Sequence, residues 1–391
     1  MSSYKILQYL ASTPSLSKGR FYPQSPTAYR NEFARDKDKI LHCNSFRRLE
    51  YKTQVFINHE GDHYRNRLTH SLEVASISRS IAQYLGLSED LTEAISLGHD
   101  LGHTAFGHSG ERALNLAMKE YGGFSHNIHT FKILVELEQC YGAYDGLNLT
   151  FEVLEGIVKH NGPIIDNPPR LFIKYEEMLH LNLAKFSSLE SQISAFSDDI
   201  AYLTHDIEDT IRSKLLSFED FSHIEFIQKI IVMLHAQYPK ITPNRLAYEL
   251  ARNIITFFID DLIRNTIKNI EDNKIKSIED VKNFGDFLVG FSEQGAENFK
   301  ELKQLFVSRV YNHPSIALIF GKTDHVIQKL FEAYKTNPTI LPQRWYNSVC
   351  NAKNQKRVAH IVGNYIAGMT DRFAISEFEK IYQINFSDIK A

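Results

Sequence analysis

The spacing of apolar residues between positions 69 and 98 predicts two consecutive helices. Four apolar residues recur three or four positions apart and so line one face of a helix over 69–84: Val74, Ile77, Ile81 and Leu85. Gly86 suits the C-terminal cap of this helix, because glycine readily adopts the left-handed conformation found there. Ser88 precedes the second helix as a typical N-cap. This second helix is therefore expected to end at the polar pair His99-Asp100.

Helical spacing recurs along most of the remaining chain. A charged helical pattern covers 31–51, and further helices are expected over 109–121, 124–137, 151–160 and 188–215. From 221 to 334 helical stretches alternate with short polar breaks, and 345–382 predicts at least two more helices. Residues 53–57 form a short strand-like run, which a turn follows over 58–62. Few segments alternate in the manner of strands, so the sequence predicts an all-α fold.

Composition narrows the class of protein. The chain has 391 residues, a hydrophobic content of 43% and a formal net charge of -3. The hydrophobic content is enough for the core of one large or two ordinary domains. The slightly negative net charge leaves no general basic field for nucleic acid. Three widely spaced cysteines (Cys43, Cys140 and Cys350) fit a reducing compartment. No apolar run approaches the ~18 residues of a membrane span, so we expect a cytoplasmic protein without membrane contact.

Residues 98–111 concentrate groups that bind metals and transfer protons. Five such residues lie within this short stretch: His99, Asp100, His103, His108 and Glu111. Neutral imidazole and carboxylate together are ligands for a borderline or hard divalent metal. A histidine with a carboxylate partner is also a sound general acid or base near neutral pH.

Three other segments place polar groups where a core would not require them, over 65–71, 124–127 and 197–206. In the last segment Asp198, Tyr202 and Asp206 are four residues apart and share one helical face. Asp199 points about 100° away from that face. The order His70, then His99-Asp100, then a distant aspartate is the signature of the HD-domain metal phosphohydrolases.

Longer motifs make the resemblance more specific. The following stretches closely resemble the deoxyguanosine-triphosphate triphosphohydrolase (dGTPase) family, in its short dGTPase-like branch: 31–36, 46–49, 52–55, 61–65, 67–75, 98–111, 146–150, 156–160, 198–206 and 365–374. The resemblance implies an HD-domain helical bundle with additional C-terminal helices. We expect an irregular arm over 1–30, the HD-domain core over 31–216, and a helical region over 217–391 that completes the nucleotide pocket and the oligomer contacts.

The resemblance also implies the site residues. The metal ligands are matched by His70, His99, Asp100 and Asp198, with Asp199 as the alternative to Asp198. His108 matches the catalytic histidine and Glu111 the acid that orients it. The substrate contacts are matched by Arg67, His103 and His126 on the phosphates and by Gln54, Tyr202 and Asp206 on the deoxyribose. A tyrosine ring against the sugar 2′ carbon would leave no room for a ribose hydroxyl.

The implied activity is metal-dependent hydrolysis of dGTP, or of deoxynucleoside triphosphates (dNTPs) in general, to deoxynucleoside and inorganic triphosphate. The implied cofactor is a divalent metal ion: Mg, Mn, or another transition metal such as Fe, Co or Zn. Members of the family form dimer-built homo-oligomers such as tetramers or hexamers, and they often need a dNTP as allosteric activator. The chain departs from the family pattern at Ala105, Ser125 and Asn364, where proline, glutamate and aspartate are expected.

Two alternatives stay open at this point. Another HD-domain phosphohydrolase, such as a nucleoside monophosphatase or a cyclic-nucleotide phosphodiesterase, would share the metal ligands without needing the deoxyribose contacts. A regulator that binds nucleotides or single-stranded DNA with little turnover would use a groove near Arg47, Arg48 and the basic residues of 350–357. The pair Arg47-Arg48 fits an effector contact, a subunit contact or an ordinary surface equally well.

Overall fold

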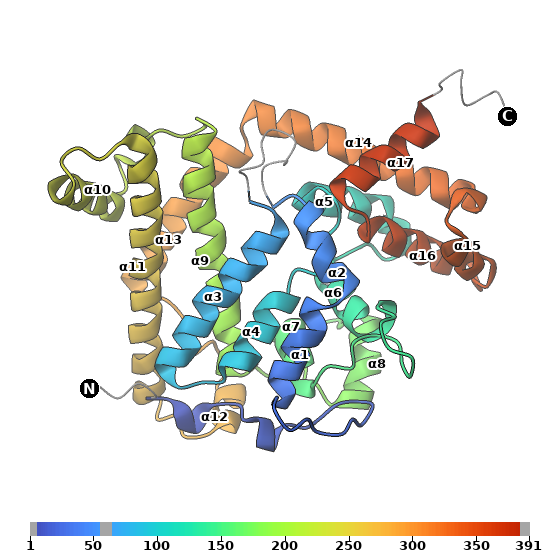
Figure 1. The fold of residues 1–391 in the computed structure, drawn as a ribbon, viewed down its shortest axis with the longest axis horizontal. Coiled ribbons are helices and arrows are strands. Elements are labelled where there is room, and N and C mark those ends of the chain that lie inside the picture. Colours follow the sequence, from blue (N-terminus) through green and yellow to red (C-terminus); the bar gives the residue numbers. More distant parts are fainter. Residues whose placement is uncertain (1–5, 55–64, 384–391) are drawn as a thin grey trace.

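The protein folds as the all-α structure that its sequence predicts (Figure 1). The computed structural model describes residues 6–54 and 65–383. Within these ranges no strand forms, and two isolated bridges join Arg20 to Thr150 and Thr53 to Asn66. Most of the predicted strand-like run and the predicted turn over 58–62 lie outside the described residues.

The α-helices follow the chain in this order: α1 (Glu32–Leu41), α2 (Asn44–Arg48), α3 (Arg67–Leu85), α4 (Glu89–Gly98), α5 (Gly107–Ala117), α6 (His126–Lys132), α7 (Phe151–Val158), α8 (Arg170–Leu179), α9 (Leu189–Arg212), α10 (Glu225–Gln237), α11 (Pro243–Asp272), α12 (Ile278–Asn283), α13 (Glu293–Phe306), α14 (Pro314–Thr336), α15 (Gln343–Cys350), α16 (Gln355–Ala367) and α17 (Asp371–Tyr382). A π-helical turn, Ile133–Leu137, extends α6. Among the helices described, none combines the length and apolar character needed to cross a bilayer.

The two helices predicted from apolar spacing form with the expected caps. Helix α3 begins after Asn66, whose side chain accepts a hydrogen bond from the backbone N–H of Thr69. It ends at Gly86, which has a φ of 81° and so supplies the left-handed cap. The hydroxyl of Ser88 accepts from the N–H of Leu91 and starts α4. As a result, α4 delivers His99 at its C-terminal end, as expected.

The charged pattern over 31–51 is broken into two helices rather than one. Helix α1 ends at Leu41, and Cys43 caps α2 by accepting from the N–H of Phe46 through its sulfur. The carboxylate of buried Glu138 accepts from the N–H and the hydroxyl of Ser45 in the first turn of α2. This long-range contact cannot be inferred from local spacing.

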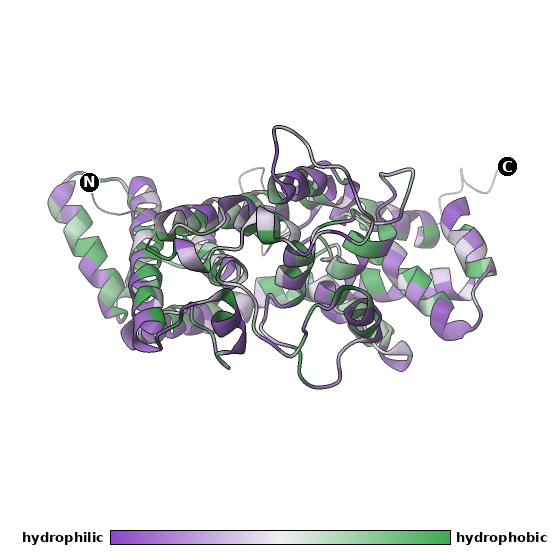
Figure 2. Ribbon diagram, turned by 90° about the horizontal axis from the view of Figure 1, so that it is seen from below, coloured by the Kyte–Doolittle hydropathy of each residue, from purple (hydrophilic) through white to green (hydrophobic). Residues whose placement is uncertain are grey.

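Three hydrophobic clusters form the core. The first joins α3, α9, α10, α11 and α13, which lie in the left half of Figure 1. The second packs α1, α2, α4, α6, α7 and α8 together. The third joins α5 to α14, α16 and α17 at the right. Figure 2 shows a flat, elongated body in which apolar and polar stripes alternate on the same helices.

The first cluster contains residues from both sides of position 216, because α11 packs against α9. The predicted division of the chain into an arm, a core and a C-terminal region stays a prediction. For the site, the decisive contacts are those among α3, α4 and α9, which pack pairwise against one another. Polar residues on their facing sides are therefore brought together.

Candidate metal centre and active site

Two imidazoles and one carboxylate converge where α3, α4 and α9 meet. His70 on α3, His99 after α4 and Asp198 on α9 place one ligand atom each within 4.8 Å of one another. Nε2 of His70 lies 2.8 Å from Oδ1 of Asp198, and Nε2 of His99 lies 3.6 Å from the same oxygen. Three of the four predicted metal ligands are thus neighbours.

The donor set fits a divalent metal ion. Nδ1 of His99 donates to the carbonyl oxygen of Ser96 at 2.6 Å, so Nε2 is the ring nitrogen that faces the cluster. This Nε2 is buried and makes no hydrogen bond within the described part of the chain. Burial alone would raise the pKa of Asp198, but the neighbouring His99, His160 and His70 hold it well below its ordinary value. The carboxylate is therefore ionised, as a metal ligand must be.

Asp100, the remaining predicted ligand, lies beside the cluster and bonds elsewhere. Its Oδ1 is 3.4 Å from Nε2 of His99 and 3.0 Å from Nε2 of His103. Its Oδ2 accepts from Nη1 of Arg67 at 2.7 Å. Arg67 is 1% exposed, and its Nε and Nη2 have no hydrogen-bond partner among the described residues. A buried cation with unpaired N–H groups next to a metal cluster suits an anionic ligand.

The two adjacent aspartates of α9 have different surroundings. Asp198 belongs to the cluster, whereas Asp199 is exposed and outside it. The difference follows from the helical rotation of about 100° per residue. The geometry therefore favours Asp198 over Asp199 as the carboxylate that α9 contributes.

A second group of titratable side chains lies along the loop that follows α4 and in the first turns of α5. His103, His108 and Glu111 bring ligand atoms within 4.8 Å of one another. Glu111 accepts from Nδ1 of His126 at 2.8 Å and from the backbone N–H of His126 at 2.8 Å. Nδ1 of His108 is 3.7 Å from the Glu111 carboxylate, beyond hydrogen-bond distance, and its side chain is 60% exposed. Glu111 thus holds His126 directly and lies near His108.

The imidazole of His126 also stacks on a neighbour in this group. The ring centroids of His103 and His126 are 3.9 Å apart, with an interplanar angle of 17°. Burial raises the pKa of Glu111, but the nearby His108 and His126 lower it well below its ordinary value. The carboxylate is therefore negatively charged beside the three histidines.

Two glycines allow the loop between α4 and α5 to pass close to other backbone. A Cβ on Gly102 would lie 2.2 Å from the backbone nitrogen of Thr130 and 2.3 Å from the carbonyl oxygen of His126. Gly107 has a φ of +56°, and a Cβ there would lie 3.1 Å from Nη2 of Arg67. No side chain fits at Gly102 without moving α6.

Two buried polar side chains to which the sequence analysis gave no role, Lys52 and Asp371, anchor the loop between α4 and α5. The ammonium of Lys52 donates to the carbonyl oxygens of His103 and Ala367. The Asp371 carboxylate accepts from the N–H of Phe106 at 2.8 Å and from the N–H of Thr53 at 3.0 Å. The C-terminal helices therefore position the loop that carries the histidines.

The predicted deoxyribose contacts come from α9 and from residue 54. Tyr202 and Asp206 lie on the same face of α9, and Asp206 accepts a hydrogen bond from the hydroxyl of Tyr311. Burial raises the pKa of Asp206 to about 8, although the Tyr311 hydroxyl opposes this shift. Gln54 is 7% exposed, and its Oε1 has no partner within the described chain. Tyr311 was not predicted, because no periodic pattern links it to α9.

Three further residues around the metal cluster were not assigned a role from the sequence. Nε2 of His160 is 3.3 Å from Oδ2 of Asp198, and its ring stacks on His99 with centroids 5.0 Å apart. Nε2 of His205 contacts the carboxylate of Glu73, and the His205 ring meets His70 edge-on at 5.3 Å. His160 is the last residue of the stretch 156–160, which resembles the dGTPase family. This stretch was the signal in the sequence that pointed to His160.

The chain resembles known proteins along nearly its whole length. The HD domain family matches residues 67–202, and the phosphohydrolase-associated domain matches 289–380. A deoxyguanosinetriphosphate triphosphohydrolase-like protein of Rickettsia felis is 47% identical over 384 residues, covering 98% of this chain and 100% of the relative. The proteins of the same name from Rickettsia bellii and Rickettsia prowazekii are 48% and 47% identical, with the same coverage.

Identity at this level over the full length shows family membership. The HD match begins at Arg67 and ends at Tyr202, so it encloses the whole metal cluster described above. The chain therefore belongs to the deoxyguanosinetriphosphate triphosphohydrolase-like family of HD-domain proteins, which are metal-dependent phosphohydrolases.

Proposed function

We propose that this protein hydrolyses deoxynucleoside triphosphates to deoxynucleoside and inorganic triphosphate. The observation that carries the proposal is the buried Arg67 beside the metal cluster, with two N–H groups left unpaired among the described residues. A guanidinium in this state suits bidentate contact with a phosphate. The names of the relatives, deoxyguanosinetriphosphate triphosphohydrolase-like proteins, support a triphosphate substrate.

Four residues would hold the metal: His70, His99, Asp100 and Asp198. A bound divalent ion would acidify a water molecule and neutralise negative charge that develops on the phosphate. Mg, Mn, Fe, Co and Zn are all candidates, since imidazole and carboxylate suit each of them. Asp100 is also bonded to Arg67, so it would set the phosphate-binding guanidinium next to the metal.

The second group of residues would handle protons and phosphate charge. The side chain of His108 is exposed and lies beyond hydrogen-bond distance of Glu111, so it would be able to reach the α-phosphate. There it would serve as general acid or base. Glu111 lies near His108 and would fix His126, which with His103 would face the phosphate oxygens. Water adds to the α-phosphorus, the bond to the 5′ oxygen breaks, and that oxygen leaves with a proton.

Selectivity for the deoxy sugar would come from α9 and residue 54. We assign the 2′ and 3′ contacts to Tyr202, Asp206 and Gln54. The hydrogen bond from Tyr311 to Asp206 would hold this carboxyl in place. A ring lying against the 2′ carbon would exclude the additional hydroxyl of a ribonucleotide.

The test is a product analysis with a matched pair of variants. The purified protein is incubated with each dNTP and with GTP in Mg²⁺ or Mn²⁺, and the products are separated by anion exchange. We expect triphosphate and deoxynucleoside from dNTPs and little product from GTP. Arg67→Lys should lower kcat/KM about 100-fold, because a lysine lacks the bidentate fork. Arg79→Lys on the same helix is the control, because Arg79 is 43% exposed and pairs with Glu89.

Other outcomes would indicate other functions. Release of monophosphate and pyrophosphate, or hydrolysis of a monophosphate or a cyclic nucleotide, would indicate a different HD-domain hydrolase. Binding of single-stranded DNA without turnover would indicate a regulator, and Lys353, Lys356 and Arg357 are exposed for such contact. Product formed only from mixed dNTPs would support the predicted activator. The predicted homo-oligomer is tested by light scattering on the same sample.

A further inference from the structure

The side chain of His160 lies against two of the candidate metal ligands at once. Its Nε2 is 3.3 Å from Oδ2 of Asp198, and its ring stacks on that of His99 with an interplanar angle of 21°. His160 is nevertheless outside the group of residues whose ligand atoms all lie within 4.8 Å of one another, which consists of His70, His99 and Asp198. It therefore contacts the ligands without belonging to the cluster that they form.

The two oxygens of the Asp198 carboxylate face different partners. Nε2 of His70 and Nε2 of His99 lie 2.8 Å and 3.6 Å from Oδ1, whereas Oδ2 faces His160. A carboxylate accepts hydrogen bonds and donates none, so Nε2 of His160 is the donor in this contact. A ring nitrogen that carries a proton has no lone pair for a metal ion. The arrangement therefore turns Oδ1 toward the other ligands and keeps Oδ2 away from them.

Close packing fixes the segment that carries His160, which follows α7 directly. A Cβ on Gly156 in α7 would lie 2.5 Å from Cδ1 of Ile95 in α4. The hydroxyl of Ser191 in α9 donates to the carbonyl oxygen of Gly156 at 3.0 Å. Helix α7 thus packs tightly against the two helices that supply His99 and Asp198, so the imidazole of His160 has little freedom to move relative to them.

Packing alone does not account for a histidine at this position. The side chain of His160 is 10% exposed, and its Nδ1 is buried without a hydrogen-bond partner among the described residues. Burying an unpaired polar atom lowers stability, so a purely structural role would favour an apolar ring here. The contact of Nε2 with Asp198 is the interaction that an apolar ring could not make.

We propose that His160 is a positioning residue of the metal centre, which holds Asp198 as a monodentate ligand through Oδ1. The N–H of His160 would retain Oδ2, and its ring would restrict rotation of the His99 imidazole. Partners of this kind orient metal ligands, and their loss typically lowers metal affinity about 10- to 100-fold. The inference rests on the metal centre of the proposed function and not on the identity of the substrate.

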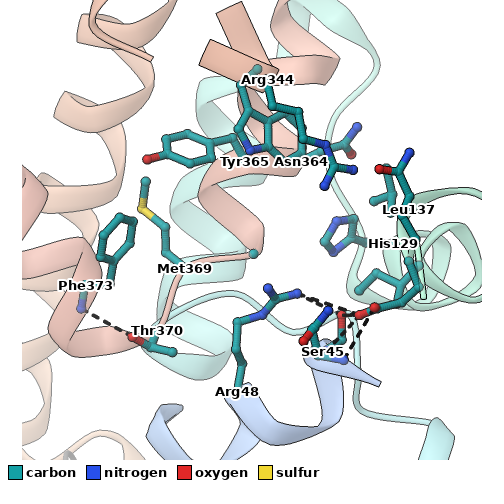
Figure 3. Close-up of a pocket in the computed structure, with 16 residues that line it drawn as sticks. Ser45, Arg48, His129, Leu137, Arg344, Asn364, Tyr365, Met369, Thr370 and Phe373 are labelled. Carbon is teal, nitrogen blue, oxygen red and sulfur yellow. Dashed lines mark hydrogen bonds and ion pairs between the residues drawn. The ribbon is translucent and has the colours of Figure 1, made fainter. Parts of the chain in front are cut away.

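A second buried imidazole near the same loop provides a matched control. His129 is 3% exposed, and its Nδ1 donates to the carbonyl oxygen of Gly102 at 3.1 Å. Figure 3 shows that its ring faces a cavity of about 480 Å³ between α2, α6 and α15–α17, and no residue of the metal cluster lines this cavity. Replacing His129 thus removes a buried ring and a hydrogen bond at a place away from the metal ligands.

The test is a titration of the full-length protein, freed of metal, with Co²⁺. The visible absorption of the bound ion reports both affinity and coordination geometry, and no substrate is needed. We expect His160→Phe, which keeps a ring against His99 but lacks the N–H, to raise the Kd for Co²⁺ about tenfold or more. His129→Phe should change this Kd less than about twofold, because it leaves the partners of the ligands in place.

Two amide variants separate the hydrogen bond from the ring. The amide nitrogen of glutamine lies as far along the side chain as Nε2 of histidine, whereas that of asparagine matches Nδ1. His160→Gln should therefore restore the Kd to within about threefold of wild type, and His160→Asn should behave as His160→Phe does. The amide pair gives the same comparison if the phenylalanine variant does not fold, which circular dichroism checks.

Three results would overturn the inference. The first is a wild-type Kd in both His160→Phe and His160→Asn. The second is an equal loss of affinity in His129→Phe, which would make the effect one of general stability. The third is an altered Co²⁺ spectrum in His160→Gln without recovery of affinity, which would make His160 itself a ligand. If the Co²⁺ results are as expected but no dNTP is cleaved, the proposed substrate is refuted and the positioning role is supported.

Discussion

Nε2 of His70 lies 2.8 Å from Oδ1 of Asp198, although 128 residues separate the two positions in the chain. Packing of α3 against α9 creates this contact, and the helical rotation of α9 turns the next residue, Asp199, to the exposed side. Two adjacent aspartates with nearly identical chemistry thus differ in access to the cluster. They form a natural matched pair for testing the metal centre.

We expect Asp198→Asn to lose metal and Asp199→Asn to keep it. An amide is a weaker ligand than a carboxylate and does not offset the ion's charge, so the metal affinity of Asp198→Asn should fall at least about tenfold. Metal content after dialysis, measured by elemental analysis, checks this. Equal metal loss in the two variants would contradict the assignment of Asp198.

Glu111 should couple energetically to His126 more strongly than to His108. It makes two hydrogen bonds to His126, whereas His108 is 3.7 Å away and 60% exposed. Double-mutant cycles with Glu111→Gln should give a coupling free energy of about 1 kcal/mol with His126→Ala and less than about 0.5 kcal/mol with His108→Ala. Urea unfolding provides the free energies. The reverse order would show that Glu111 is bound mainly to His108.

Asp206 should make the protein less stable as the pH rises from about 5 to 8. Burial raises its pKa to about 8 in the folded state, whereas an unfolded aspartate loses its proton near 4. Between these values the folded state binds one more proton than the unfolded state, so the free energy of unfolding falls with rising pH.

The variant Asp206→Asn lacks this proton and should lose less stability over the same range. The difference between wild type and variant should change by about 3 kcal/mol between pH 5.5 and pH 8. Urea unfolding at the two pH values measures it. A pH-independent difference would mean that Asp206 titrates normally in the folded protein.

Substitution by alanine should lower the stability of the protein at Gly102 and raise it at Gly321. At Gly102 the new Cβ would overlap backbone atoms of Thr130 and His126 at 2.2 and 2.3 Å, so Gly102→Ala should cost about 3 kcal/mol or more. At Gly321 in α14 nothing lies within 4 Å, and Gly321→Ala should add about 0.5–1 kcal/mol through helix propensity. Thermal unfolding compares the two. Tolerance of Gly102→Ala would contradict the close approach of α6 to the loop.

Local pattern predicted most of the elements, whereas the candidate metal ligands came mainly from the family resemblance. The caps at Ser88 and Gly86 and the apolar stripe of α3 depend on neighbouring residues only, and the structure confirms them. The stripe of Asp198, Tyr202 and Asp206 likewise needs only the helical period. Short-range rules were therefore sufficient to bring His99 to the end of α4 and Asp198 to one face of α9.

Contacts that depend on how helices pack were not predictable in this way. The hydrogen bonds from His126 to Glu111 span a glycine-containing turn, and the Tyr311 contact with Asp206 joins residues 105 positions apart. The pairing of His205 with Glu73 depends on the register between α3 and α9. Such contacts are set by tertiary packing, so they appear only in the folded structure.

The most direct test of the account is hydrolysis of a dNTP in water labelled with ¹⁸O, followed by mass spectrometry of the products. Attack of water at the α-phosphorus predicts an unlabelled deoxynucleoside and inorganic triphosphate that contains one ¹⁸O. The label should appear at the same rate in Asp199→Asn and be lost in Asp198→Asn. Formation of deoxynucleoside monophosphate, or a label in the deoxynucleoside, would contradict the proposed reaction.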